Sequence, residues 1–239
     1  MKKICFAMMI FWSVLLSHKI AFAAGVGLYA TGGGSMSNWK YKDKNYGSTT
    51  DYFFGGGLVV DTAIAKNTLL NYRITAGYER YGSDSTSLYM TKNSKKTAHK
   101  FDMSYTLGFG VYRSKAIRFW AGPELGLHCI YSLDFQHVQY SLVAPYLIGD
   151  TGWATGFGEI FYTSPTKKML AIGIDALLAI GINVNLGEYT ALFAHAGFGY
   201  MGTYQLKGDK ETGNGCGAKV KIGIMFRFND SYDASPVAM

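Results

Sequence analysis

Cysteine and proline are scarce in this chain of 239 residues, which contains three cysteines and four prolines. The dense disulfide framework of a small secreted domain is therefore excluded. Cys129 and Cys216 are the two cysteines beyond the N-terminal segment, and the sequence leaves open whether they pair. No Pro/Ser-rich linker divides the chain, so a single domain is the simplest interpretation.

A strong charge of one sign is also missing. The formal net charge is +7 and falls by three, to +4, when the lysines of the N-terminal segment are left out. This mild excess does not suggest a nucleic-acid partner.

The N-terminal segment has the features of a secretory signal peptide. Lys2 and Lys3 precede an apolar run that ends at Leu16, and a small-x-small pattern follows at Ala21-Phe22-Ala23. The run is too short for a transmembrane helix, which needs about 20 apolar residues. We therefore expect residues 1–23 to be a signal peptide and the mature chain to be exported.

The main positive feature of the sequence is a strict alternation of large apolar residues with small or polar ones. In FDMSYTLGFGVY, residues 101 to 112, large apolar side chains occupy the odd positions, and Asp102, Ser104 and small residues occupy the even ones. Successive side chains of a strand point to opposite faces, so this segment predicts a strand with one wholly apolar face.

The same period recurs along the chain, giving eight expected strands. They lie at residues 25 to 36, 51 to 63, 69 to 81, 101 to 112, 117 to 129, 169 to 185, 190 to 201 and 219 to 228. Residues 169 to 185 are nearly all apolar, but repeated glycines and the central Asp175 argue against a membrane helix.

The expected connections alternate in length. Short ones fall at residues 65 to 68, 113 to 116 and 186 to 189, and long ones at 37 to 50, 82 to 99, 133 to 168 and 202 to 216. This asymmetry is typical of an antiparallel barrel in an outer membrane. We predict an all-β fold, a single eight-stranded up-and-down transmembrane β-barrel. Residues 133 to 168 form either a projecting hairpin, which we favour, or two further strands of a ten-stranded barrel.

On these features the chain resembles the small outer-membrane barrels of the OmpA/OmpX type, which include opacity- and adhesin-like surface proteins. The resemblance rests on the signal peptide, the eight alternating segments and the last strand KVKIGIMFRF, which ends at Phe228. It implies a barrel over residues 24–228 in the outer membrane of a Gram-negative cell envelope. Residues 229–239 depart from the pattern as a short polar tail.

The interior of an eight-stranded barrel is just wide enough for its own side chains. Charged residues on the inward face must be paired or hydrated. We therefore expect a structural ion-pair network that closes the lumen, with a conducting path as the alternative. Its predicted members are Arg73, Glu79, Asp102, Arg118, Glu124, Asp175, Lys219, Lys221 and Arg227.

No catalytic or metal-binding motif is recognisable. None of the five histidines has a serine two residues further on, as a deacylase-like site would require. His128 and His195 are expected to line the lumen. Two isolated cysteines offer no zinc spacing, so we expect no cofactor, no metal and no enzymatic activity.

Function is therefore expected at the surface. We expect an outer-membrane protein with a structural or adhesin-like role, whose long extracellular loops carry any binding; a narrow porin-like channel or a lipid-modifying enzyme is the alternative. The expected partners are outer-membrane lipid and lipopolysaccharide, periplasmic chaperones and the barrel-insertion machinery during assembly, and a host or cell-surface ligand at the loops. Lysines in these loops could bind the phosphates of lipopolysaccharide or a host polyanion. The protein is expected to be a monomer.

Overall fold

The computed structural model describes residues 25–41, 44–62, 69–86, 94–114, 116–135, 138–142, 159–163, 167–187, 189–207 and 212–227. The predicted signal peptide at 1–23, the short connection at 65 to 68, Phe228 and the polar tail at 229–239 lie outside these residues. None of the described residues forms a helix long and apolar enough to cross a membrane.

The chain forms strands throughout its described length. They are β1 (Gly25–Tyr41), β2 (Lys44–Asp61), β3 (Leu70–Thr86), β4 (Ser94–Arg113), β5 (Ile117–Phe135), β6 (Val138–Leu142), β7 (Glu159–Thr163), β8 (Lys167–Asn185), β9 (Thr190–Lys207) and β10 (Thr212–Arg227).

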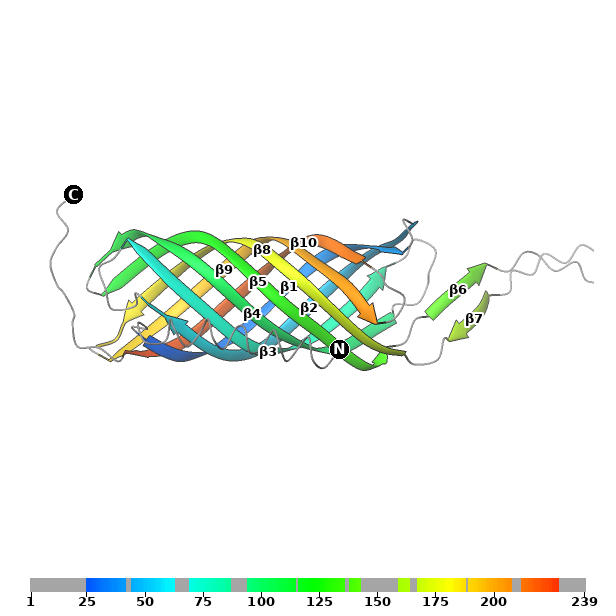
Figure 1. Cartoon of the computed structure of the whole chain (residues 1–239), viewed down its shortest axis with the longest axis horizontal. Coiled ribbons are helices and arrows are strands. Elements are labelled where there is room, and N and C mark those ends of the chain that lie inside the picture. Colours follow the sequence, from blue (N-terminus) through cyan, green and yellow to red (C-terminus); the bar gives the residue numbers. More distant parts are fainter. Residues whose placement is uncertain are drawn as a thin grey trace, which may run out of the picture.

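Eight of these strands close into an antiparallel barrel (Figure 1). Their order is β1-β10-β9-β8-β5-β4-β3-β2, and β1 pairs with both β2 and β10, so the sheet has no free edge. Closure matters because an open edge in hydrocarbon would leave backbone N–H and C=O groups without partners. The predicted eight-stranded up-and-down barrel is confirmed.

Strands β6 and β7 pair only with each other and stay outside the barrel (Figure 1). The choice between eight and ten strands is thereby settled in favour of the projecting hairpin. The end of the barrel that carries this hairpin is called the hairpin end below. The opposite end, where Ser114 and Leu186 lie in the tight connections, is called the turn end.

The sequence predicts four long loops, and three of these predictions are wrong. The barrel strands have 16 to 20 residues, and only residues 42–43, 87–93 and 208–211 separate β1 from β2, β3 from β4 and β9 from β10. The strands continue toward the hairpin end after their outward face has become polar, for example at Asn38 and Lys40. Only the connection from β5 to β8 is long.

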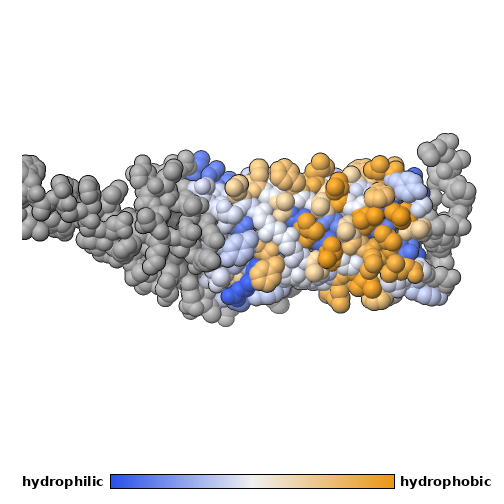
Figure 2. Space-filling model, turned by 180° about the vertical axis from the view of Figure 1, so that it is seen from behind, coloured by the Kyte–Doolittle hydropathy of each residue, from blue (hydrophilic) through white to orange (hydrophobic). Residues whose placement is uncertain are grey.

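The two faces of the sheet separate as the alternation predicts. On β4, Phe101 and Phe109 are exposed on the outside by 56% and 43%, whereas the inward side chains of Asp102 and Ser104 are buried. On β8, the outward Leu178 is 68% exposed. A broad band of apolar side chains covers one part of the barrel's length in Figure 2, and the part beyond it is more polar.

An outer wall of this kind is stable in lipid and not in water, because exposed apolar patches of this extent are rare on soluble monomers. A closed antiparallel barrel with an outward apolar band is the architecture of transmembrane β-barrels. The chain is therefore a membrane-spanning barrel.

Candidate functional site: the charged lumen

The lumen contains as many buried cations as buried carboxylates. Among the residues that the structure describes, these are Arg73, Lys100, Arg118, Lys219, Lys221 and Arg227 on one side, and Asp51, Asp61, Glu79, Asp102, Glu124 and Asp175 on the other. All twelve lie on inward positions of the barrel strands. A balance of charge is required here, because an uncompensated ion away from water is strongly disfavoured.

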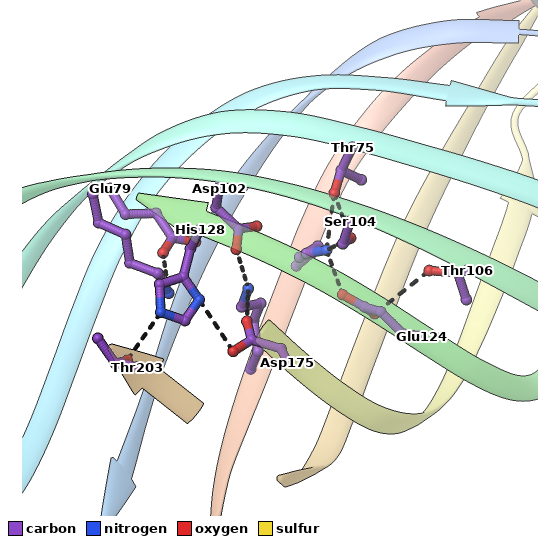
Figure 3. A network of polar contacts seen from close by, with 12 residues as sticks. Thr75, Glu79, Asp102, Ser104, Thr106, Glu124, His128, Asp175 and Thr203 are labelled. Atoms are coloured by element: carbon purple, nitrogen blue, oxygen red, sulfur yellow. Dashed lines mark hydrogen bonds and ion pairs between the residues drawn. The ribbon is translucent and has the colours of Figure 1, made fainter. Parts of the chain in front are cut away.

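Lys219 joins the cluster nearer the hairpin end, and Figure 3 shows three other members of this cluster, Asp102, His128 and Asp175. The Nζ of Lys219 lies 2.8 Å from Asp102 Oδ1 and 3.3 Å from Asp175 Oδ2. The other oxygen of Asp175 lies 3.2 Å from His128 Nδ1, and His128 Nε2 is 3.1 Å from Thr203 Oγ1. Side chains from β4, β5, β8, β9 and β10 thus meet across the lumen.

A second cation lies beside this cluster. Lys100 Nζ is 3.0 Å from Glu79 Oε2 and 4.0 Å from the centre of the Phe53 ring. Phe53 belongs to an apolar layer inside the barrel, in which it packs with Tyr81, Ala98, Ile130, Ala171, Leu177 and Met201. The ammonium groups are therefore covered by an aromatic face as well as by carboxylates.

Lys221 is the centre of the middle cluster. It donates to Glu124 Oε1 at 2.9 Å, to Thr75 Oγ1 at 2.9 Å and to Ser104 Oγ at 2.6 Å. All three hydrogens of its ammonium group are thereby used. The other oxygen of Glu124 lies 2.6 Å from His195 Nε2.

The turn end is organised around Arg73. Its Nε and Nη2 both donate to Asp61 Oδ2, at 2.9 and 2.7 Å, and Nη2 also donates to Asn183 Oδ1 at 2.8 Å. The guanidinium lies over the rings of Trp120 and Phe193, 4.9 and 4.6 Å from their centres. Phe193 belongs to a second apolar layer that also contains Tyr29, Val59, Ala191 and Met225.

All nine charged residues expected in the lumen point inward and are buried. Three ion pairs join members of that set, namely Lys219 with Asp102, Lys219 with Asp175, and Lys221 with Glu124. Arg73 and Glu79 pair instead with Asp61 and Lys100, which the sequence reasoning missed.

The two missed residues had detectable signals. Lys100 is the next even position of the alternation that begins at Phe101, so extending that strand by one residue places it inside. Asp61 lies directly opposite Arg73 in the register. The glycine triplet at 55 to 57 blurs the alternation of its strand.

Among the described residues, one group of side chains has the composition and spacing of a metal site. Asp102, His128 and Asp175 come close enough together for a metal ion. The Lys219 ammonium, however, already lies between the two carboxylates. A divalent ion would have to displace this lysine, so the cluster is better explained as an ion-pair network.

The two cysteines of the barrel lie too far apart to form a disulfide. Cys129 on β5 and Cys216 on β10 are separated around the barrel by β8 and β9. With neighbouring strands about 4.8 Å apart, the separation exceeds the Cα distance of about 7 Å that a disulfide tolerates. The open question of their pairing is answered in the negative.

No family model matches the chain, and no curated protein matches it either. Solved structures with a similar arrangement include the outer membrane protein OprG from Pseudomonas aeruginosa. That match has a TM-score of 0.45 and 10% identity, and it covers 87% of this chain and 97% of that one. Ail of Yersinia pestis, solved with the heparin analogue sucrose octasulfate, has a TM-score of 0.36 and 9% identity, with 85% and 99% covered.

The outer membrane protease OmpT from Escherichia coli has a TM-score of 0.39 and 6% identity, with 85% and 95% covered. Similarities this low carry no information on what the present chain binds or does. Its own closed sheet and apolar band identify it as a small barrel of the outer-membrane type.

Proposed function

We propose that this chain is an exported outer-membrane surface protein with a closed barrel, whose contacts with other molecules are made at the hairpin end. The observation that carries the proposal is the filling of the lumen by buried charge clusters and by two clusters of buried apolar side chains. Ions crossing the barrel would have to break the contacts of Lys219 and Lys221. The interior therefore supports a structural role, and surface interaction is left to the segments outside the lipid.

The connection between β5 and β8 is the best candidate for that interaction. It is the only long connection at the hairpin end, and it carries the β6–β7 pair. Residues 136 to 166 contain six aromatic residues and no lysine or arginine. Aromatic side chains dominate many protein-recognition surfaces, so this segment suits an adhesin-like contact with a protein better than the binding of a polyanion.

Contact with outer-leaflet lipid is supported on the outer wall of β3 and β4. Tyr78 and Phe101 pack edge to face with their ring centres 5.5 Å apart, and His99 Nδ1 lies 2.6 Å from the Tyr78 hydroxyl. The exposed Arg80 follows on the side toward the hairpin end, opposite His99. An aromatic pair at the edge of an apolar band with a cation beyond it fits the boundary where lipid acyl chains meet phosphate groups.

Export by residues 1–23, assembly by periplasmic chaperones and the insertion machinery, and a monomeric state belong to the same proposal. The closed sheet leaves no strand edge for pairing with a second copy.

Planar-bilayer recording tests the closed lumen. The refolded protein should show no steady conductance, whereas large and ion-selective channels would contradict the proposal. Lys221→Met should be recorded in parallel, because opening of this variant alone would assign the closure to the middle cluster.

Deletion of the hairpin tests the surface role. Cells that display the barrel with residues 138–163 replaced by a short Gly/Ser turn should lose attachment to mammalian cell monolayers. The matched control is Asn214→Ala on the outer wall of β10, which should attach normally. Attachment that survives the deletion, with equal amounts of barrel at the surface, would place the activity elsewhere.

The lipid-modifying alternative has one observation in its favour. Thr203, His128 and Asp175 follow each other in the order of a nucleophile, a base and an orienting carboxylate. His128 and Asp175 are almost inaccessible to solvent. If the chain is such an enzyme, lipid hydrolysis should be detectable with wild-type protein in mixed micelles and be lost in Thr203→Val; we expect no hydrolysis in either.

A further inference from the structure

The outer wall of the barrel changes character between two neighbouring levels of β3 and β4. At the first level Tyr78 lies opposite Phe101, and both rings are exposed. At the next level toward the hairpin end, the exposed Arg80 lies opposite the half-buried His99. Directly opposite residues on one face of a sheet have their Cβ atoms about 5 Å apart. A guanidinium and an imidazole therefore stand side by side at the edge of the apolar band.

Aromatic side chains flank this pair on both sides. Phe54 on β2 lies opposite Arg80, and Tyr131 on β5 lies opposite His99. Both aromatic residues are exposed. The four residues form one row across β2, β3, β4 and β5, called the aromatic row below. Aromatic residues collect at the depth where acyl chains meet the polar headgroups of a membrane, so this row marks the level at which charged headgroup atoms lie.

The guanidinium of Arg80 has hydrogen-bonding capacity left for a ligand. Within the described part of the chain its partner is Thr97 Oγ1, at the long distance of 3.4 Å, and no carboxylate of these residues pairs with it. Arginine carries several N–H donors in a planar fork and always keeps its charge. A bond of this length to an exposed hydroxyl is weak, so it is readily exchanged for a contact with an anion.

The imidazole of His99 is held in place by Tyr78. Nδ1 of His99 lies 2.6 Å from the Tyr78 hydroxyl, and the centres of the two rings are 5.8 Å apart. We assign the phenol as the donor of this hydrogen bond, which places the imidazole proton on Nε2. Nε2 is then a donor beside Arg80 that is already oriented when a ligand arrives. Such a donor loses little freedom on binding, which favours affinity.

We propose that Arg80 and His99 bind a phosphate group carried by a glycolipid of the outer leaflet, the chemical class to which lipopolysaccharide belongs. The fork of Arg80 matches two phosphate oxygens and forms paired, charge-assisted hydrogen bonds with them. The Nε2–H of His99 donates to a third oxygen, and the exposed rings of Phe54 and Phe101 contact the acyl chains.

The position of the pair selects a lipid over a free ion. Two basic groups exposed to water attract a small anion only weakly, whereas a lipid adds the contact of its acyl chains with the neighbouring apolar band. This inference rests on the contact with outer-leaflet lipid in the proposed function, and it names the lipid group and the residues that bind it.

Binding of bisphosphorylated lipid A, the lipid part of lipopolysaccharide, to the refolded barrel tests the proposal. The full mature chain in an uncharged detergent is titrated with lipid A, and native mass spectrometry counts the bound lipid. The same glycolipid with both phosphates removed is titrated in parallel. Lipid A should bind saturably, the dephosphorylated lipid should bind about tenfold or more weakly, and added inorganic phosphate should not displace lipid A.

Substitutions separate the phosphate contact from the contact with the rest of the lipid. Arg80→Gln should weaken the binding of lipid A by about tenfold or more, because it removes both the charge and the fork. It should leave the weak binding of the dephosphorylated lipid unchanged, which a distorted barrel would not do. Arg80→Lys keeps the charge and loses the fork, so its affinity should lie between those of wild type and Arg80→Gln. His99→Phe keeps an aromatic ring and removes the Nε2 donor, and it should also weaken lipid A binding.

Lys40→Gln is the matched control, because Lys40 is also an exposed cation but lies on β1, outside the aromatic row. It should leave the binding of lipid A unchanged. An equal loss in this control, an unchanged affinity in Arg80→Gln, or displacement of lipid A by inorganic phosphate would overturn the proposal.

The two glycolipids also distinguish a failure of this site from a failure of the proposed function. Wild-type protein that binds both lipids equally would keep the lipid contact and overturn the phosphate site. Wild-type protein that binds neither lipid would overturn the lipid contact itself, and the phosphate site with it.

Discussion

Replacement of Lys219 by methionine tests the ion-pair network most sharply. Methionine preserves the length and apolar stem of the side chain and removes only the ammonium group. The two carboxylates that lie 2.8 and 3.3 Å from Nζ then remain in the lumen without their shared cation. Both are at most 1% exposed, so water cannot replace the lost contacts.

The expected effect is large. Removing one partner of a buried ion pair destabilises a protein by about 3–5 kcal/mol, because the other charge remains buried. Lys219 serves two carboxylates, which favours the upper part of this range. Lys100, the other cation of this half of the lumen, limits the effect because it remains in place. We therefore expect Lys219→Met to lower the free energy of unfolding by about 3–5 kcal/mol.

The measurement is equilibrium urea unfolding in lipid vesicles, followed by tryptophan fluorescence. The triple variant Lys219→Met/Asp102→Asn/Asp175→Asn removes all three charges, so it should be more stable than the single variant. Lys40→Met, at an exposed position on β1, is the control and should change stability by about 0.5 kcal/mol or less. A single variant as stable as the wild type, or a triple variant less stable than the single one, would refute the network.

Three further substitutions test other parts of the structure by the same unfolding measurement. Leu178→Arg places a charge on the exposed apolar band and should cost about 2–4 kcal/mol, whereas Thr97→Arg, outside that band, should have almost no effect; equal effects would show that the band does not face lipid. Trp120→Ala removes a buried ring beside Arg73 and should cost about 3–5 kcal/mol; a loss below about 1 kcal/mol would mean that the ring does not fill the lumen. Gly77→Val would place Cβ against the Tyr29 hydroxyl and 2.8 Å from the carbonyl oxygen of residue 56, so it should impair folding, and normal refolding would contradict this close packing.

The sequence predicted the part of the fold that lies in lipid better than the part beyond it. Between Phe101 and Val111 one face is wholly apolar, so the period of two is unmistakable. At Asn38 and Lys40 the outward face is polar, as is Ser37 on the inner face. Pairing continues there without any hydrophobic contrast, which explains why strand ends were mistaken for loops.

For the charged lumen, the sequence likewise predicts one feature, which residues point inward, and not another, which residues pair. Alternation alone decides which residues point inward, and the nine charged residues that the sequence assigns to the lumen are all buried. It does not decide which residues meet, because the pairs join strands far apart in the sequence. Lys219 and Asp102 are 117 residues apart, and Arg73 meets Asn183 over 110 residues. These contacts depend on the register of the closed barrel.

Contacts between side chains and lipid on β4 test the central claim, that alternate residues face hydrocarbon and a charged, closed interior. In nanodiscs, nuclear Overhauser effects from acyl-chain protons should reach the side chains of Met103, Tyr105 and Leu107, but not those of Ser104 and Thr106. Equal contacts from both sets of residues, or contacts only to the polar set, would contradict it.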